Sequence, residues 1–160
     1  MDLGALVEMS VVKVSPYLRA ERPLLWLCEK GAPGPRLLPI AIGQFEAAAI
    51  QMRLDRETPL RPISYDLIAS ILQHLEVPVR YVLIHTVRKQ VYYARVAVEH
   101  HGLVRELDSR PSDAVALALR TDAPVYVSHG LLVEAGLGPL GSAADIELAI
   151  MCFYEPEPQV

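Results

Sequence analysis

Short apolar runs separated by glycine and proline open the chain. Residues 8–14 are rich in valine, residues 24–28 are almost wholly apolar, and residues 37–42 form a third run that contains Pro39. Runs of this length between turn-forming residues are typical of strands, so we predict an antiparallel meander. Because proline has no backbone N–H to donate, the third strand is expected at a sheet edge or at an irregular strand end.

After Gly43 the apolar positions follow a helical period. Residues 44–54 are rich in alanine and predict an amphipathic helix, and a polar loop over residues 55–62 precedes a second helix with Ser64 as its N-cap. The apolar positions of the first helix are Phe45, Ala48, Ala49 and Met52. The apolar stripe of the second comprises Leu67, Ile68, Ile71, Leu72 and Leu75.

The second half of the chain combines strands with one strongly apolar helix. Residues 79–87 and 91–98 predict a β-hairpin, and residues 103–107 predict a further strand. A helix is expected to start at Pro111 and to end at Arg120, and its apolar character on nearly all sides predicts burial. The remaining predicted elements are a strand at 124–128, a short helix at 131–135 and a helix at 142–153.

Together these elements predict an α+β fold, with a mostly antiparallel sheet and several helices packed on it. Residues 1–137 are expected to form a single domain, and residues 138–160 a C-terminal extension that is first helical and then disordered at the proline- and glutamate-rich end.

Composition excludes several broad classes of protein. Hydrophobic residues make up 52% and charged residues 21%, which rules out an intrinsically disordered chain. The longest apolar runs are far shorter than the roughly 18 residues of a membrane span. The start lacks the basic segment of a secretory signal, and Cys28 and Cys152 are too few for a disulfide framework. We therefore expect a cytoplasmic protein with reduced cysteines.

The charge balance limits how nucleic acid could bind. The formal net charge is −4, whereas proteins that grip nucleic acid with their whole surface are normally basic. Arginine nevertheless dominates the basic residues, because only Lys13, Lys30 and Lys89 are lysines. Arginine matches the geometry of phosphate, so the composition permits a local phosphate site.

Candidate chemistry is concentrated in residues 108–113. The chain has no nucleotide-binding glycine loop and no zinc-protease, serine-hydrolase or paired-cysteine motif, and its five histidines lack metal-ligand spacing. In contrast, residues 108–113 place two aspartates, two serines and Arg110 before and at the start of the apolar helix. A helix N-terminus attracts anions, and Asp108 and Asp113 could hold a divalent cation. Helix capping and a local ion pair explain the same residues without any ligand.

Several blocks of the sequence also occur in a characteristic order. These are the string LPIAIG at residues 38–43, followed by a helix with Glu46, the string RPISYDL at 61–67, the string DSRPSDAVALALR at 108–120, the string APVYV at 123–127 and the helix end at 134–136. In this order and spacing they resemble the bifunctional nuclease domain family, over about residues 8–137. The resemblance implies an α+β domain that assembles as a homo-oligomer and cleaves both DNA and RNA.

The chain departs from the family pattern at two positions. Gln44 stands where relatives often carry an acid, and Tyr65 stands where they often carry a histidine. Both changes remove a group that could serve as a ligand or a base, so they favour reduced or absent catalysis.

Our main hypothesis is a metal-assisted nuclease with a local site for nucleic acid. The predicted catalytic acids are Asp108, Asp113, Asp66 and Glu46. The predicted phosphate partners are Arg110, Arg61, Arg120 and Ser112. Asp108 and Asp113 are the predicted ligands of Mg²⁺ or Mn²⁺, and His85 is an additional candidate for a base. The alternatives are a non-catalytic oligomeric binding or regulatory module and a purely structural oligomerisation domain, in which residues 108–113 only cap the helix.

Overall fold

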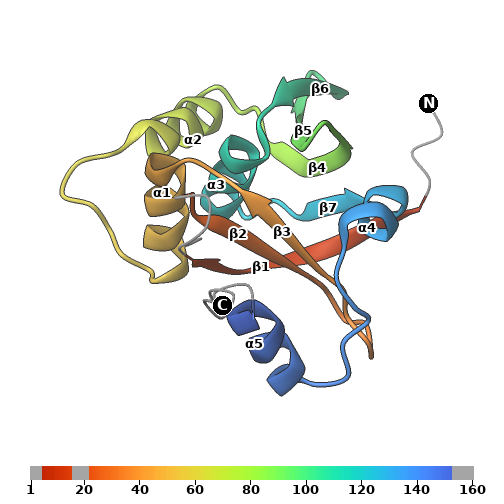
Figure 1. The fold of residues 1–160 in the computed structure, drawn as a ribbon. Coiled ribbons are helices and arrows are strands. Elements are labelled where there is room, and N and C mark those ends of the chain that lie inside the picture. Colours follow the sequence, from red (N-terminus) through yellow and green to blue (C-terminus); the bar gives the residue numbers. More distant parts are fainter. Residues whose placement is uncertain (1–4, 16–21, 153–160) are drawn as a thin grey trace.

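One strongly twisted sheet organises the molecule (Figure 1). The computed structural model describes residues 5–15 and 22–152, so the predicted disorder at the C-terminal end lies outside the described residues. The strand order in the sheet is β3-β2-β1-β7-β4-β5-β6. The strands are β1 (Leu6–Ser15), β2 (Leu24–Glu29), β3 (Leu37–Ala41), β4 (Val79–Arg88), β5 (Val91–His100), β6 (Leu103–Ser109) and β7 (Val125–Ser128). Every neighbouring pair is antiparallel except β4 and β7, which confirms a mostly antiparallel sheet.

The predicted meander is confirmed at one end of the sheet. β1 pairs with β2 and β2 pairs with β3, and β3 is an edge strand, which is one of the two positions predicted from Pro39. The predicted hairpin is also confirmed. β4 and β5 are joined at Lys89 and Gln90, which both have positive φ angles, as in the turns that match strand twist.

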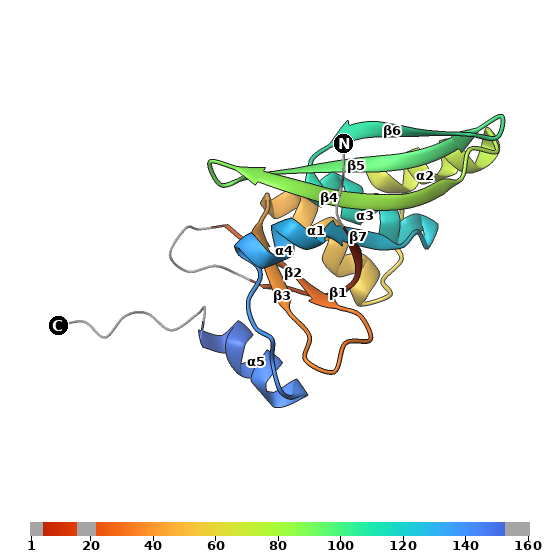
Figure 2. The same ribbon diagram turned by 90° about the vertical axis from the view of Figure 1, so that its right-hand side faces the viewer.

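Five helices accompany the sheet within the described residues. They are α1 (Gln44–Leu54), α2 (Ser64–His74), α3 (Pro111–Thr121), α4 (His129–Ala135) and α5 (Ala143–Cys152). The helices α1, α2 and α3 gather on one side, whereas α5 lies apart from them below β2 and β3 (Figures 1 and 2). In the described part of the chain, every helix is too short or too polar to cross a membrane.

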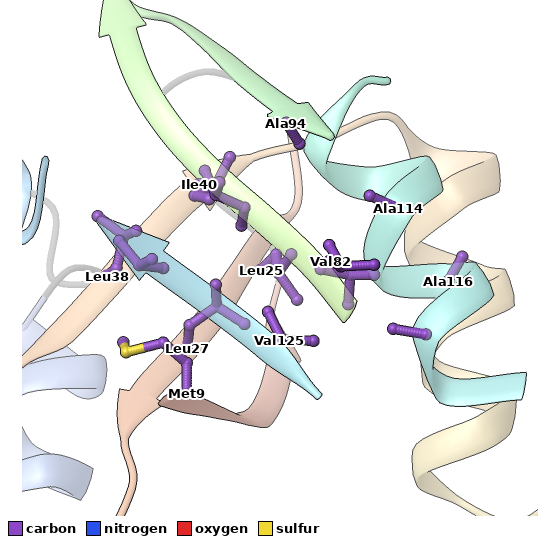
Figure 3. Close-up of a cluster of buried hydrophobic side chains, with 14 of the residues drawn as sticks. Met9, Leu25, Leu27, Leu38, Ile40, Val82, Ala94, Ala114, Ala116 and Val125 are labelled. Carbon is purple, nitrogen blue, oxygen red and sulfur yellow. The ribbon is translucent and has the colours of Figure 1, made fainter. Parts of the chain in front are cut away.

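The main core lies between the sheet and α3. Leu25 and Val82 point from the sheet into a cluster that Ala114 and Ala116 enter from α3 (Figure 3). Small alanine side chains let α3 lie close to the strands, and all residues of this helix from Ala114 to Ala118 are buried. Burial of a side chain the size of leucine or valine stabilises the folded state by about 1.5–3 kcal/mol. Because several such side chains are buried in this layer, their packing fixes the position of α3 and so the position of its first residue.

A second apolar cluster lies on the opposite face of β2 and β3. Trp26 and Leu37 are fully buried there, and α5 covers them with Ile150. The Trp26 indole N–H donates to the buried Ser15 hydroxyl over 2.7 Å. The predicted C-terminal helix therefore exists and contributes to packing, while its status as a separate extension stays a prediction.

Three sequence expectations are wrong in detail. The helix α1 buries Ala47, Ala49 and Ile50, whereas Phe45 is 89% exposed. The N-cap of α2 is Ile63, and Ser64 is already the first helical residue. The strand β6 continues to Ser109, two residues beyond the predicted end, because pairing with β5 extends that far.

Candidate functional site

The start of α3 carries a compact polar network, as the sequence indicated. Asp113 lies in the first turn of this helix, and Arg110 is the residue just before it. The Asp113 carboxylate accepts from Arg110 Nε over 2.7 Å and from Arg110 Nη2 over 2.9 Å. It also accepts from the Tyr65 hydroxyl of α2 over 2.6 Å. Two helices are thereby joined through one carboxylate.

Glu46 of α1 completes this group. Arg110 Nη2 donates to Glu46 Oε1 over 2.8 Å, so the guanidinium bridges two carboxylates from different helices. We call Glu46, Tyr65, Arg110 and Asp113 the Arg110 network. Gly43 explains why Glu46 can reach this position, because a Cβ atom at Gly43 would lie only 2.1 Å from Glu46 Oε2. The final glycine of the LPIAIG string thus leaves room for a carboxylate.

Arg110 is the exposed member of the network. Its side chain is 64% exposed, against 16% for Glu46 and 33% for Asp113. A guanidinium has five N–H donors, and the contacts above use Nε and Nη2. Among the described residues Nη1 has no hydrogen-bond partner, so its two N–H groups remain available to a ligand. The two carboxylates fix the orientation of a cation that still faces solvent.

Asp113 and Tyr65 hold fixed protonation states near neutral pH. Partial burial raises the pKa of Asp113, but hydrogen bonds from Arg110 and Tyr65 outweigh this effect and keep the pKa below its ordinary value of 3.8. Burial and the hydrogen bond to Asp113 raise the pKa of Tyr65 far above its ordinary value. Tyr65 is therefore a protonated donor that positions Asp113, and it cannot act as a base.

A second ion pair lies behind the network. Arg120 Nε donates to Asp66 over 2.7 Å, and the other two nitrogens of Arg120 donate to the carbonyl oxygens of Ala116 and Ala49. The Arg120 side chain is only 3% exposed, and its guanidinium lies 5.4 Å from the centre of the Tyr65 ring. These contacts tie α1, α2 and α3 together, so Arg120 has a structural role.

The remaining predicted site residues lie outside the Arg110 network. Asp108 belongs to β6 and pairs with Arg95 of β5, whereas its neighbour Leu107 pairs with Val96, which is part of the main core. Asp108 therefore lies on the sheet face away from α3, and the charge of Asp108 acts on His85. Arg61 is exposed in the loop before α2 and has no ion pair in the described part of the chain.

Ser112 is close to the network but buried. It is 5% exposed, and its hydroxyl finds no hydrogen-bond partner among the residues that the structure describes. It cannot contact a phosphate without a local rearrangement of the first turn of α3.

The acids of this site do not fit a divalent cation in the observed arrangement. Asp113 and Glu46 are engaged by Arg110, and Asp66 is engaged by Arg120 and by the backbone N–H of Ile63. Within residues 5–15 and 22–152, no three His, Cys, Asp or Glu side chains are placed to hold a metal ion. Asp108 and Asp113, the predicted ligands, lie on different sides of the sheet.

Sequence reasoning missed two features of the site. Tyr65 was interpreted as a loss, although a phenol at this position still reaches Asp113, which its helical position two residues into α2 could have indicated. A groove of about 680 Å³ was also missed, and no motif marks it. It runs along α2 past Asp66 to the ends of α1 and α3, with Arg53 at its border.

Comparisons with known proteins identify the family of the chain. The family model described as bifunctional nuclease domain matches residues 27–139. An uncharacterized protein of Mycobacterium tuberculosis, MT1877 in strain CDC 1551 and Rv1829 in strain H37Rv, is 38% identical over 130 residues, which cover 81% of this chain and 76% of that protein. Bifunctional nuclease 1 of Oryza sativa subsp. indica is 28% identical over 104 residues, which cover 63% of this chain and 31% of that protein. The chain therefore belongs to the bifunctional nuclease domain family.

Proposed function

We propose that this protein is a nuclease that hydrolyses phosphodiester bonds of DNA or RNA at the Arg110 network. The observation that carries the proposal is the geometry of Arg110, whose guanidinium is exposed, oriented by Asp113 and Glu46, and left with two N–H donors at Nη1. A guanidinium held in advance suits the charge that develops on phosphoryl oxygens during the reaction. Membership of the family supports the same assignment.

The proposed chemistry assigns one role to each residue. Arg110 Nη1 donates to the non-bridging oxygens of the phosphodiester, and Asp113 and Tyr65 hold Arg110 in place. Glu46 accepts a proton from water through Oε2 as the water oxygen bonds to phosphorus. The bond from phosphorus to the leaving sugar oxygen breaks, and that oxygen takes up a proton from solvent. Asp66 and Arg120 support the three helices and take no part in the cleavage of the bond.

The groove beside α2 gives a strand of nucleic acid a path away from Arg110. Asp66, which directly follows Tyr65 in α2, lines this groove. Its volume of about 680 Å³ falls in the range of ligand sites in proteins. The nucleic acid would thus contact a local site, in keeping with the net charge of −4.

The experiment is a nuclease assay on highly purified protein with single-stranded and double-stranded DNA and RNA. Arg110→Ala is expected to reduce cleavage by about 100-fold or more, as when one charge-stabilising donor is removed. Glu46→Gln is expected to reduce cleavage by about 100-fold or more, as when a general base is removed. Glu134→Gln, a change of an exposed acid on α4, is the matched control and should retain activity. Equal activity in Arg110→Ala and the parent would contradict the assignment. Cleavage would then come from another site or from a contaminating nuclease.

The sequence also predicted assistance by Mg²⁺ or Mn²⁺. Since the acids are engaged, no step above depends on a metal ion. Parallel assays with EDTA and with added Mg²⁺ or Mn²⁺ measure the requirement directly. A strict requirement would mean that Glu46 and Asp113 separate from Arg110 when the substrate binds.

A non-catalytic binding module is the second candidate. The observation that favours it is the closure of the network, in which Asp113 has partners on both carboxylate oxygens. Gln44, which stands where relatives often carry an acid, also favours binding without catalysis. This candidate predicts saturable, salt-sensitive binding of oligonucleotides without cleavage, and loss of that binding in Arg110→Ala. Self-association is predicted under both candidates.

A further inference from the structure

The groove beside α2 differs in charge from the Arg110 network. Arg53 lies in the last turn of α1, Glu76 follows α2 by two residues, and Thr121 is the last residue of α3, and all three line the groove. The groove is therefore bordered by the C-terminal ends of three helices, whose carbonyl oxygens carry partial negative charge. This charge repels phosphate and attracts groups that donate hydrogen bonds.

Two carboxylates of the groove are free to bind a ligand. Glu76 and Asp122 line the groove, and within residues 5–15 and 22–152 neither side chain makes a hydrogen bond or an ion pair. The side-chain amide of Gln73, another groove residue, is unpaired in the same part of the chain. Arg120 is already engaged in an ion pair, so Arg53 is the cation of the described groove that remains to offset the two acids.

Stability alone does not explain the positions of these two acids. The φ angle is 54° at Glu76 and 53° at Asp122, so both residues lie in the left-handed region that favours glycine. Both also follow a helix, where the helix dipole disfavours negative charge. Side chains held at such positions, with no contact to offset the cost, are candidates for ligand recognition.

The walls of the groove offer an apolar surface to a flat ring. Leu72, Val77 and Val79 line the groove, and all three also pack against the main core, which holds them in place. Nucleobases that are turned out of a strand stack on apolar side chains and use their edges for hydrogen bonds. The groove thus combines a stacking surface with free acceptors.

One tyrosine contacts both the groove and the Arg110 network. The Tyr65 hydroxyl donates to Asp113, and the centre of its ring lies 5.4 Å from the guanidinium of the groove residue Arg120. A strand with one phosphate at Arg110 can therefore place a nearby base in the groove.

We infer that the groove binds one unpaired nucleobase with an exocyclic amino group, which means adenine, cytosine or guanine, from a single-stranded segment of the substrate. This inference rests on the proposed function, because it takes nucleic acid as the ligand. Ionised carboxylates accept hydrogen bonds and cannot donate them, so Glu76 and Asp122 select bases that present amino groups. Thymine and uracil lack the amino group and present carbonyl oxygens, which the acids repel.

The remaining polar groups of the groove suit the same ligand. The Gln73 amide can both donate to and accept from the edge of adenine. Arg53, at the border of the groove, can bind the phosphate next to the bound base. In a duplex the pairing edges of the bases are occupied, so a base enters the groove only from a single strand.

Fluorescence anisotropy with labelled oligo(dA), oligo(dC) and oligo(dT) of equal length tests the inference on the full chain. The parent should bind oligo(dA) and oligo(dC) about tenfold more tightly than oligo(dT) or better, as expected for one or two contacts to a base edge. The double variant Glu76→Gln, Asp122→Asn should bring this ratio close to one. Glu134→Gln, which removes an exposed acid outside the groove, is the matched control and should keep the ratio.

The ratio is the readout because the loss of two negative charges by itself strengthens the binding of all three oligonucleotides. Asparagine tolerates the left-handed backbone at position 122, and circular dichroism checks that the double variant folds. Equal binding of the three oligonucleotides by the parent, binding of none of them, or a ratio that the double variant leaves unchanged overturns the inference.

Cleavage assays separate this failure from a failure of the proposed function. Loss of cleavage in Arg110→Ala without any base preference would retain the nuclease and remove the groove as a base site. A base preference that depends on the two acids, in a protein that does not cleave, would retain the groove site and support the binding module.

Discussion

A single phenol links α2 to the proposed site. The Tyr65 hydroxyl donates to Asp113 over 2.6 Å, and its raised pKa keeps it protonated at neutral pH. We expect Tyr65→Phe to lower the free energy of unfolding by about 1 kcal/mol, since the bond reaches a charged but partly exposed carboxylate. Urea denaturation measures the change. Tyr93→Phe, whose hydroxyl has no hydrogen bond in the described residues, should change nothing, and equal losses in both variants would contradict the role of Tyr65.

Gly43 controls the position of the Glu46 carboxylate. The φ angle of Gly43 is −73°, so alanine fits the backbone, but its Cβ would lie 2.1 Å from Glu46 Oε2. Glu46 must then turn away from Arg110. We expect Gly43→Ala to cost about 1 kcal/mol of stability or less, and to reduce nuclease activity as strongly as Glu46→Gln. Gly130→Ala, where a new Cβ meets no atom within 4 Å, is the control. Full activity in Gly43→Ala would show that Glu46 does not need this position.

Three members of the Arg110 network were named from the sequence, and side-chain direction explains why other candidates lie elsewhere. Arg110 and Asp113 were predicted because a helix start rich in acid and arginine is visible in the chain, and Glu46 was predicted from the resemblance to the family. Asp108 was grouped with them by proximity in sequence. In a strand, successive side chains point to opposite faces, so the extension of β6 to Ser109 places Asp108 away from α3. Burial of Arg120 depends on the packing of three helices, which the sequence pattern does not reveal.

At the scale of the elements, the Asp66–Arg120 pair makes helix packing depend on pH. Burial opposes the charge of Asp66, but hydrogen bonds from Ile63 and Arg120 lower its pKa below the ordinary value of 3.8. A lowered pKa in the folded state stabilises the protein above 3.8, and this contribution is lost as the pH falls through the folded-state value. We expect Asp66→Asn to cost about 2 kcal/mol at neutral pH, less than breaking a fully buried pair, because Asp66 is a quarter exposed.

Urea denaturation at a series of pH values checks this expectation. The parent should lose stability steeply in acid, whereas Asp66→Asn should start lower and show a shallower loss. Asp145→Asn changes an exposed acid on α5 and should keep the steep profile of the parent. Parallel profiles for the parent and Asp66→Asn would mean that this ion pair does not link helix packing to pH.

The apolar positions of α2 show a limit of pattern reasoning at this scale, because Leu67, Ile71 and Leu75 are exposed. The spacing of Leu67, Ile71 and Leu75 correctly indicates a helix, but a periodic pattern does not say which face meets the core. In this chain α3 accepts the narrow face of Tyr65, Ala69 and Leu72 instead. An apolar stripe that faces solvent and one that faces the core look alike in one sequence.

At the scale of the whole molecule, chain topology brings distant segments to one site. The strand β7 pairs with β1 and with β4, and thereby joins the N-terminal meander to the β4–β5–β6 ribbon. Its parallel pairing with β4 was not predictable, because strand order depends on tertiary packing, and local sequence patterns do not indicate how the elements pack. As a result α1 and α2, from the first half of the chain, meet α3 from the second half, and Glu46 reaches Arg110 across 64 positions.

The electrostatics of the whole chain predict a shallow salt dependence of nucleic-acid binding. The net charge is −4, and the proposed site offers one exposed guanidinium with Arg53 at the border of the groove. Because each neutralised phosphate releases counterions, contacts with one or two phosphates give a slope of about −1 to −2 in a plot of log K against log salt concentration. Fluorescence anisotropy with a labelled oligonucleotide measures this slope. Arg110→Ala should make it shallower by about 1. A slope several times steeper would require a broad basic surface, and the local site proposed here would then be wrong.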